Sequence, residues 1–267
     1  MDLKRNAERF TGQSYVSLYD DYRPEPPQDN ILQGLKYLGV EKADFILDLG
    51  CGTGLSTRVL SAYGNNIIGI EPSEEMLTVA RAKTKAKHIS YQQGFAHDTG
   101  IASNSVDLVT CSQSFHWMEP KSTLKEIDRV LKDTGVLLIY DVIWPPSTNY
   151  DYEMAYKKLF ANVDRLTQKL DEKIAYKWEK HNHLNNIEQS GIFSYVKETY
   201  YHKTEAFNTD TFIGIALSQG GLEALLKRGF SEDEIGITAF KKAIQTATTP
   251  CDTLTYNYRV IFGTRKP

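Results

Sequence analysis

Three alternating glycines and two acids are the residues of this chain best suited to binding chemistry. Gly50, Gly52 and Gly54 stand at every second position, and Asp48 lies two residues before the first of them. Because glycine has no side chain, a ligand can lie directly against the main chain at such a turn. Glu71 follows along the chain, and its carboxylate can accept hydrogen bonds from both hydroxyls of a ribose. These residue types predict a nucleoside-binding turn.

The flanking residues predict the elements that hold this turn. Residues 45–49 are apolar except for Asp48, which is typical of a strand buried on both faces of a parallel sheet. Apolar residues then recur at helical spacing from Leu55 to Tyr63, and Gly64 ends the pattern. The glycines therefore join a strand to a helix, which is where an open α/β sheet binds its ligand.

The second acid ends the second expected strand, residues 66–71. The carboxyl ends of parallel strands meet at one edge of the sheet, so Glu71 should lie beside the glycine turn. Pro72 and Ser73 begin the next helix, with Ser73 as the expected N-cap. Met76 in that helix can contact the base of a nucleoside, and it can equally well pack in the core.

Two other glycine-rich motifs do not fit. A P-loop requires Lys followed by Ser or Thr after its last glycine, and here Leu55 and Ser56 follow. A dinucleotide fingerprint counted from Gly50 has its third small residue at position 55, where Leu55 would crowd the helix against the strand. What remains is an acid, one residue, and three alternating glycines.

Residues 47–54, Leu-Asp-Leu-Gly-Cys-Gly-Thr-Gly, resemble motif I of the class I S-adenosylmethionine-dependent methyltransferases. With Glu71, residues 94–96 and Phe115-His116-Trp117, the chain is similar to the type 11 group, which includes trans-aconitate methyltransferases. The resemblance covers residues 1–141 well and is only general beyond them. It implies S-adenosylmethionine as cofactor and an α/β fold with a Rossmann-like, doubly wound, seven-stranded, mostly parallel sheet.

The resemblance also implies a set of residues that contact this cofactor. They are Asp48, Gly50, Cys51, Gly52, Thr53, Gly54, Glu71, Pro72, Met76, Phe95, Ala96, Ser112 and Gln113, with Tyr22 and Arg23 from the leader. Residues 1–30 are expected to form a lid in which Arg23 pairs with the methionine carboxylate, although aromatic packing on the domain explains them as well. Phe95 stands where the family often has the Asp beside adenine, so it could stack on the base instead.

The reaction implied is an in-line displacement at a sulfonium, so the protein must align the acceptor and exclude water. A carboxylate acceptor needs no base, whereas a hydroxyl, carbon or amine nucleophile can need one. His116, in the exit loop of the strand at 106–112, is the best-placed base, and packing under a cap is the competing interpretation. The predicted substrate wall is Tyr19, Trp117, Trp144 and Tyr150, for which core or cap packing is also possible.

The pattern of elements predicts the organisation of the chain. Strands and helices alternate up to residue 141, as βαβ units require, and Trp144-Pro145-Pro146 is then expected to break the chain. After the lid of residues 1–30, we expect residues 31–144 to form the cofactor-binding core and residues 145–190 a helical cap insertion. Residues 191–267 should hold the last two strands with a second helical insertion at about 208–250.

Composition limits the partners and the compartment. The net charge of −3 and pI of about 6.1 disfavour nucleic acid as a partner. Cys51, Cys111 and Cys251 form no paired motif, so neither a disulfide framework nor a metal site is predicted. No run approaches the roughly 18 apolar residues that cross a bilayer, and the charged start lacks the apolar stretch of a signal peptide. A cytoplasmic enzyme for a small molecule is expected, with the acceptor and the oligomeric state left open.

Two other classes remain open from the sequence. A nicotinamide-dependent oxidoreductase would share the sheet, but Leu55 argues against its fingerprint. A non-catalytic binding protein could keep the fold, because fold alone does not imply function. The intact Asp48, glycine turn and Glu71 argue against decay of the site.

Overall fold

Apolar, β-branched strands build the sheet that carries this molecule. The computed structural model describes residues 13–170 and 176–265, and its seven strands lie in the order β3-β2-β1-β4-β5-β7-β6. They are β1 (Ala43–Leu49), β2 (Gly64–Glu71), β3 (Ile89–Gln93), β4 (Val106–Ser112), β5 (Leu131–Ser147), β6 (Tyr195–Ala206) and β7 (Thr253–Thr264). The first five pair in parallel, and β7 runs antiparallel to both β5 and β6. The predicted seven-stranded, mostly parallel sheet is confirmed.

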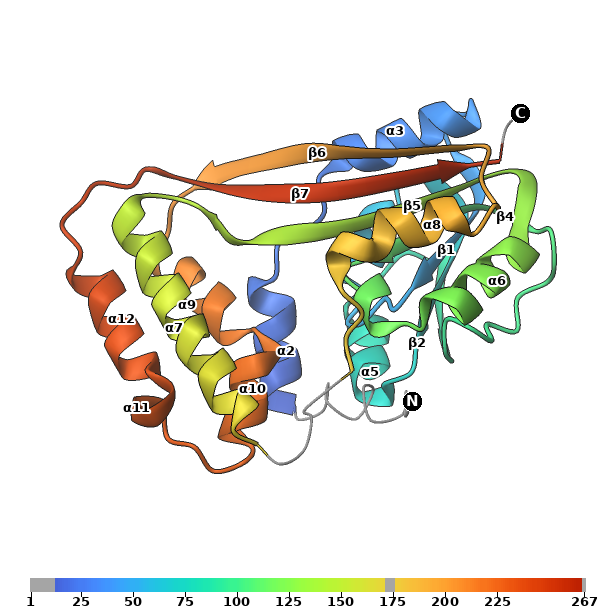
Figure 1. Cartoon of the computed structure of the whole chain (residues 1–267). Helices are drawn as coiled ribbons and strands as arrows, with labels where there is room; N and C mark the ends of the chain where they lie inside the picture. The colour runs from blue at the N-terminus through green and yellow to red at the C-terminus, as the bar shows by residue number, and fades with distance from the viewer. Residues whose placement is uncertain (1–12, 171–175, 266–267) are drawn as a thin grey trace.

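Helices cover both faces of the sheet (Figure 1). They are α2 (Gln13–Tyr22), α3 (Gln28–Leu38), α4 (Leu55–Leu60), α5 (Glu74–Lys83), α6 (Pro120–Val130), α7 (Tyr150–Gln168), α8 (His183–Gln189), α9 (Thr209–Leu217), α10 (Gly220–Leu226), α11 (Glu232–Ile235) and α12 (Ile237–Thr246), with 3₁₀ turns η1 (Phe115–Trp117) and η2 (Lys180–Asn182). Alternate residues of β5 enter opposite cores: Leu138 packs with Ile31 of α3, and Leu137 packs with Ile127 of α6. The central strands β1, β4 and β5 are therefore buried on both faces in the parallel part of the sheet, as the apolar run 45–49 predicted for β1, whereas the edge strand β6 is partly exposed.

The predicted break at Trp144-Pro145-Pro146 is wrong. β5 continues through both prolines to Ser147, and the Trp144–Pro145 peptide bond is cis. Proline has no N–H for a sheet ladder, and the structure accommodates this with a register shift: Ile143 pairs with Asn257, and the next pair is Ser147 with Thr255. The long outer ends of β5, β6 and β7 thus project beyond the parallel part of the sheet.

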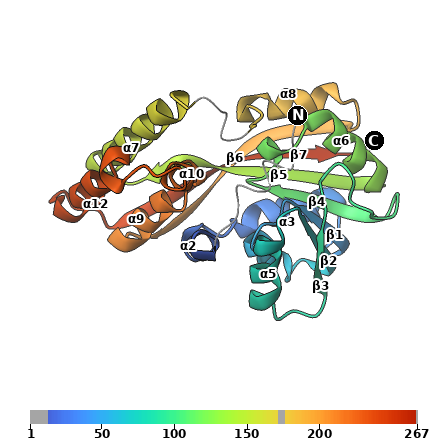
Figure 2. The same cartoon turned by 90° about the horizontal axis from the view of Figure 1, so that it is seen from below.

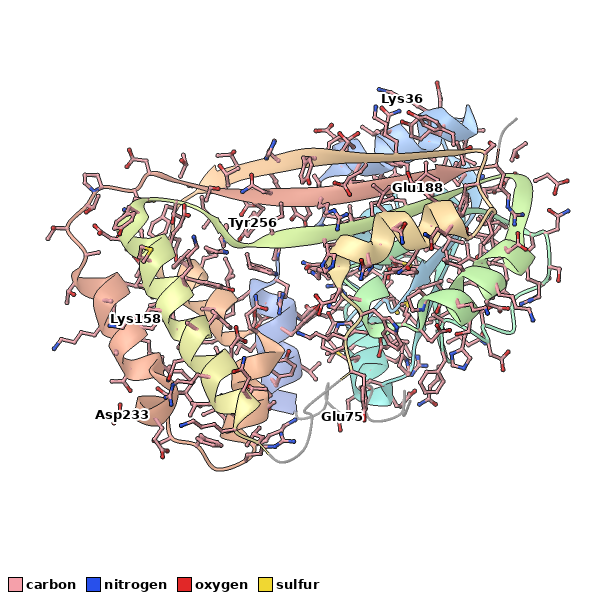
Figure 3. All side chains as sticks on the ribbon, in the orientation of Figure 1. Lys36, Glu75, Lys158, Glu188, Asp233 and Tyr256 are labelled. Carbon is pink, nitrogen blue, oxygen red and sulfur yellow. The ribbon has the colours of Figure 1, made fainter. Side chains whose placement is uncertain are left out.

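A second group of helices packs beneath these outer ends (Figures 1 and 2). It consists of α7 and α9–α12, and we call it the cap. Its core joins aromatic rings of Tyr156, Phe212 and Phe240 to the strands. Side chains fill the space between the cap and the strands, among them Tyr256 of β7, which is 2% exposed (Figure 3). The helices α9 to α12 lie within the segment 208–250 that was expected as a helical insertion.

Residues 145–190 and the helix α2 belong neither wholly to the cap nor wholly to the core. Residues 145–190 divide, because α7 joins the cap while α8 packs on α6 and β6. α2 contacts α5 of the core and α9 of the cap, so it bridges the two (Figure 2). The part of the expected leader before residue 13 lies outside the described residues. Among the helices of the described ranges, none combines the length and the apolarity that a membrane span needs.

Candidate functional site

The turn between β1 and α4 takes a backbone conformation that only glycine adopts easily. Gly50, Gly52 and Gly54 have φ of +67°, +56° and +77°. A Cβ added at Gly50 would lie 2.6 Å from Cβ of Ser114, and one at Gly54 would collide with the Tyr91 ring. At Gly52, by contrast, an added Cβ would meet nothing within 4 Å. Gly50 and Gly54 are thus required by packing, whereas Gly52 faces open space.

Asp48 holds this turn from behind. Its carboxylate accepts hydrogen bonds from the hydroxyls of Ser56 at 2.8 Å, Thr57 at 2.7 Å and Thr110 at 2.7 Å. The side chain is fully buried, and that burial raises its pKa although the three hydroxyls oppose the shift. The acid of the motif therefore ties β1 to α4 and β4.

Glu71 meets the same turn from the end of β2. Its Oε2 accepts the N–H of Gly52 at 3.1 Å, and its Oε1 accepts the N–H of Ser73 at 3.0 Å. Burial raises the pKa of this carboxyl to about 7, despite the two amides that favour the ionised form. Each oxygen keeps a further lone pair, so the carboxylate can still accept hydroxyl donors from a ligand.

The turn and Glu71 open onto a cavity whose empty space, open solvent included, is about 800 Å³. Its lining includes, among the residues expected from the sequence, Tyr19, Gly50, Gly52, Glu71, Pro72, Met76, Phe95, Ala96, Ser112, Gln113 and Trp117. Gly94, part of the segment 94–96 in the family resemblance, lines it too, whereas the sequence did not single out the other lining residues, Ile70, His97, Ser114, Met118, Glu119 and Thr123. Most of these follow β3 and β4, so the rule that strand ends share one edge was the available signal.

Four of the expected cofactor residues lie behind or beside this lining. Asp48, Cys51, Thr53 and Gly54 belong to the turn but do not line the cavity. Cys51 is buried, and a side chain on Gly69 of β2 would collide with its sulfur. These residues position the main chain that faces the cavity.

Tyr22 and Arg23 of the leader lie against the cap, although Tyr19 of the same segment lines the cavity. Arg23 donates to the carbonyl of Ser218 and to Oε1 of Gln219, both at 3.0 Å. Its guanidinium lies 4.8 Å from the ring centre of Tyr19 and 5.1 Å from that of Trp144. The Tyr22 ring packs on Gly214 of α9, and Tyr150 is 75% exposed. The cavity lining includes none of the predicted residues Tyr22, Arg23, Trp144 and Tyr150.

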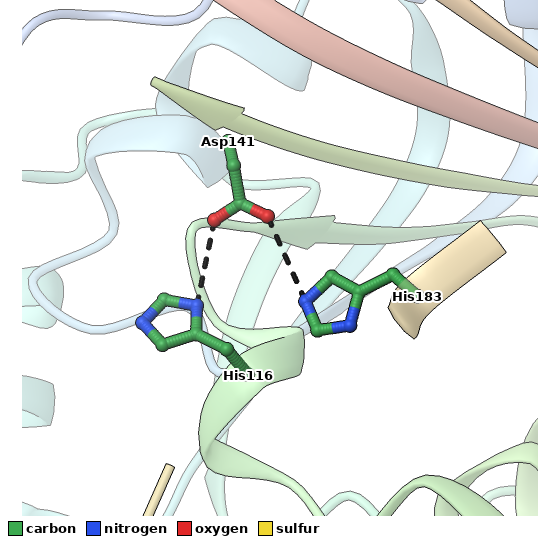
Figure 4. Close-up of side chains that lie close together, drawn as sticks. All are labelled: His116, Asp141 and His183. Atoms are coloured by element: carbon green, nitrogen blue, oxygen red, sulfur yellow. Dashed lines mark ion pairs between the residues drawn. The ribbon is translucent and has the colours of Figure 1, made fainter. Parts of the chain in front are cut away.

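His116 belongs to a buried polar cluster beside the cavity (Figure 4). Its Nδ1 lies 3.4 Å from Oδ1 of Asp141, and Nε2 of His183 lies 3.9 Å from Oδ2 of the same carboxylate. Lys180 Nζ approaches Oδ1 to 2.6 Å. We call these four residues the polar cluster. His116 itself does not line the cavity, although its neighbour Trp117 does.

Burial sets the charges of the polar cluster. It lowers the pKa of His116 to about 4, which the carboxylate only partly opposes, and that of His183 to about 4 as well. Burial alone would raise the pKa of Asp141, but His116 and Lys180 outweigh it and hold that pKa below its usual range. At neutral pH the cluster thus combines two neutral imidazoles, one carboxylate and one ammonium.

Known proteins resemble this chain in sequence and in fold. A family model for a methyltransferase domain matches residues 47–139. The Saccharomyces cerevisiae protein CRG1, named as an S-adenosylmethionine-dependent methyltransferase, is 28% identical over 49% of this chain and 47% of its own length. The chain therefore spans about half of that relative. The Bacillus subtilis protein YqeM, named as a methyltransferase, is 29% identical over 75% of this chain and 80% of its own.

Among solved structures, a methyltransferase-like protein of Anaeromyxobacter dehalogenans superposes with a TM-score of 0.70. The superposition covers 92% of this chain and 99% of that one, at 17% sequence identity. At this identity the likeness concerns the fold, and it extends over nearly the whole chain, cap included.

Proposed function

Because this chain belongs to the class I S-adenosylmethionine-dependent methyltransferases of type 11, with S-adenosylmethionine as cofactor, we propose that it methylates a small-molecule acceptor. The observation that carries the proposal is the cavity, which joins the glycine turn and Glu71 to aromatic side chains from the leader and from η1. The cofactor supplies a methyl group on a sulfonium. The residues around it have to bind it, orient the acceptor and exclude water.

The cofactor is proposed to occupy the part of the cavity between the turn and β3. The open space over Gly52 admits a ligand against the main chain, and Glu71 would accept the ribose hydroxyls. Phe95 and His97, whose ring centres lie 5.5 Å apart, supply the aromatic surface for adenine where the family often has an acid. Met76 lines the same cavity and serves as an apolar contact.

We propose a carboxylate as the acceptor, since such a nucleophile needs no general base. Two observations support this choice over a hydroxyl. The predicted base, His116, is turned toward Asp141 and does not line the cavity. In addition, the Lys177 ammonium lies 4.8 Å from the ring centre of Trp117, so a cation accompanies the predicted substrate wall. For His116 to act as the base of a hydroxyl acceptor, η1 would have to rearrange.

The test is an acceptor screen that detects S-adenosylhomocysteine. A panel of carboxylic acids is compared with the alcohols of the same carbon skeletons. We expect turnover only with carboxylates, methyl esters as products, and a loss of turnover in Trp117→Ala with unchanged cofactor affinity. Turnover with the alcohols alone would overturn the carboxylate proposal. If the cofactor binds and no acceptor reacts, the protein is better described as a non-catalytic binding protein.

A further inference from the structure

We propose that His116, Asp141 and His183 form a binding site for a divalent transition-metal ion of the zinc class. The three side chains come from η1, β5 and α8, and their imidazole nitrogens and carboxylate oxygens point toward one another (Figure 4). One ligand atom from each residue lies within 4.8 Å of the others. Two imidazoles with one carboxylate are a donor set that zinc and its neighbours accept.

The distances in this cluster suit ligands of one ion better than hydrogen bonds. A hydrogen bond from an imidazole N–H to a carboxylate spans about 2.7–3.2 Å. The two contacts to Asp141 measure 3.4 Å from His116 and 3.9 Å from His183. Zinc bonds of about 2.0–2.2 Å in tetrahedral geometry separate neighbouring ligand atoms by roughly 3.4 Å. The contact of His116 with Oδ1 has this spacing, whereas the contact of His183 is with the other oxygen, Oδ2. The three ligand atoms lie within 4.8 Å of one another, so the side chains must draw together by up to about 1.4 Å to share one ion.

The imidazole nitrogens that face the carboxylate also lack other partners. His116, Asp141 and His183 are 7%, 6% and 1% exposed. Nδ1 of His116 and both ring nitrogens of His183 form no hydrogen bond with any residue in the described ranges. Buried polar atoms are normally paired, so such a concentration within one small cluster calls for an explanation. An ion at its centre would engage one nitrogen of each ring.

The donor atoms of the cluster support the same assignment. Each histidine offers a ring nitrogen and Asp141 offers a carboxylate oxygen. The mixed nitrogen and oxygen donors favour a zinc-like ion over magnesium or calcium, which prefer oxygen ligands alone.

Lys180 is the competitor of this ion. Its ammonium lies 2.6 Å from Oδ1 of Asp141, so it occupies the carboxylate whenever no ion does. Two cations on one carboxylate repel each other, and a metal ion must therefore displace the ammonium. The Lys180 side chain is 36% exposed and can turn into solvent without burying its charge. Removal of this ammonium should tighten metal binding.

The two roles considered for His116 are mutually exclusive. An imidazole bound to an ion through Nδ1 keeps its remaining proton on Nε2, so it cannot accept another proton there. The metal-bound cluster would thus fix η1 and the adjoining Trp117 wall, without acting as a base. The metal proposal does not depend on the identity of the acceptor, because its test measures ion binding alone.

The experiment uses the whole chain, stripped with a chelator and titrated with Zn²⁺ against a chromophoric competitor. Co²⁺ absorption then reports the coordination directly. We expect one ion per chain and at least tenfold weaker binding in His116→Ala and in His183→Ala. His181→Ala is the matched control, since His181 is a close neighbour of His183 with a side chain that is 74% exposed, and its affinity should not change. Lys180→Ala should bind at least tenfold more tightly than the wild type.

Lys180→Ala also guards against variants that fail to fold, because it keeps all three ligands and predicts a gain. No binding in both the wild type and Lys180→Ala would overturn the proposal. Equal losses in His181→Ala and His183→Ala would also overturn it, because they would assign the ion to surface histidines.

Discussion

Two buried aspartates, Asp48 of β1 and Asp141 of β5, have opposite surroundings. Asp48 lies behind the glycine turn and is surrounded by the three hydroxyls that donate to it. Asp141 lies in the polar cluster and meets an ammonium at 2.6 Å, with imidazoles at 3.4 Å and 3.9 Å. Neutral donors leave the pKa of Asp48 above its usual value, and charged or titratable neighbours hold that of Asp141 below it.

The difference separates a structural acid from an acid that is available for chemistry. Asp48 accepts a hydrogen bond from each of its three hydroxyl partners, so it ties the turn to α4 and β4 without a ligand. The partners of Asp141 are long contacts and one exchangeable ion pair, so their arrangement can change. We therefore expect substitutions at the turn to affect binding and folding strongly, and substitutions in the polar cluster to leave the fold largely intact.

The largest effect is expected at Gly52. In Gly52→Val the added side chain would fill the open space that faces the cavity, and S-adenosylhomocysteine affinity should fall at least about 100-fold by calorimetry. Gly191→Val is the matched control, because Gly191 has a similar φ of +68° and also has open space around an added Cβ. Both variants carry the same backbone strain, and only the first should lose binding. Retained binding in Gly52→Val would show that the ligand lies elsewhere.

The next effect compares the two aspartates directly. Asp48→Ala leaves three buried hydroxyls without an acceptor and should lower the free energy of unfolding by about 3 kcal/mol. Asp141→Ala leaves two neutral imidazoles and a lysine that can reach solvent, so about 1 kcal/mol is expected at pH 7. Urea unfolding of both variants measures the contrast. Equal losses would mean that the polar cluster is as structural as the turn.

Asp48 and Asp141 should affect the pH dependence of the free energy of unfolding with opposite signs. The folded-state pKa of Asp141 is lowered, so its contribution to stability is present above the unfolded value of about 3.9 and is lost as the pH falls further. The folded-state pKa of Asp48 is raised, so its ionisation in the folded protein costs stability as the pH rises past about 3.9. Acid unfolding should thus be less steep in Asp141→Asn than in the wild type.

The glycine turn and the polar cluster also differ in how well the sequence predicts them. The glycine turn, its strand and its helix are encoded within residues 45–64, so hydrophobic pattern and glycine spacing were sufficient. The position of Glu71 beside the turn could be predicted because the carboxyl ends of parallel strands meet at one edge of the sheet. In the structure its carboxylate accepts a hydrogen bond from the N–H of Gly52. The β-branched and aromatic pattern of the chain end likewise favoured a strand where β7 (Thr253–Thr264) lies.

The remainder depends on contacts between residues that are distant in the chain. The polar cluster joins residues 116, 141, 180 and 183, which no spacing rule connects. The extension of β5 through Pro145 and Pro146 depends on pairing with β7, more than a hundred residues later. The partners of Arg23 at Ser218 and Gln219 were likewise invisible, so the sequence assigned this residue to the ligand instead.

A smaller effect is expected from the titration of Glu71. Its pKa of about 7 in the free protein means that half of the molecules carry a protonated carboxyl near neutrality. Ribose hydroxyls need an acceptor, so binding should select the ionised form and weaken about tenfold from pH 8 to pH 6. Glu71→Gln should bind more weakly at pH 8, and its affinity should not change between pH 8 and pH 6.

Glu119→Gln is the control for this pH dependence. Glu119 lines the same cavity, but hydrogen bonds from the first turn of α6 lower its pKa below the usual value despite partial burial. The wild-type slope should persist in it.

The smallest effect concerns α2, which bridges the two regions. Its Asp20 pairs with Arg58 of the core at 2.9 Å, and Arg23, directly after it, holds Ser218 and Gln219 of the cap. Arg23→Ala removes these cap contacts together with the contacts of the guanidinium with the Tyr19 and Trp144 rings. Amide exchange should therefore speed up about fivefold, or about 1 kcal/mol, in α2 and at the start of α10. Arg58→Ala should speed amide exchange in α2 while leaving exchange in α10 unchanged.

The ligand should act on the same helix. Since Tyr19 lines the cavity, S-adenosylhomocysteine should slow amide exchange in α2 of the wild type and of both variants. If the ligand leaves α2 exchange unchanged in the wild type, the helix is a fixed bridge between core and cap and takes no part in covering the cofactor.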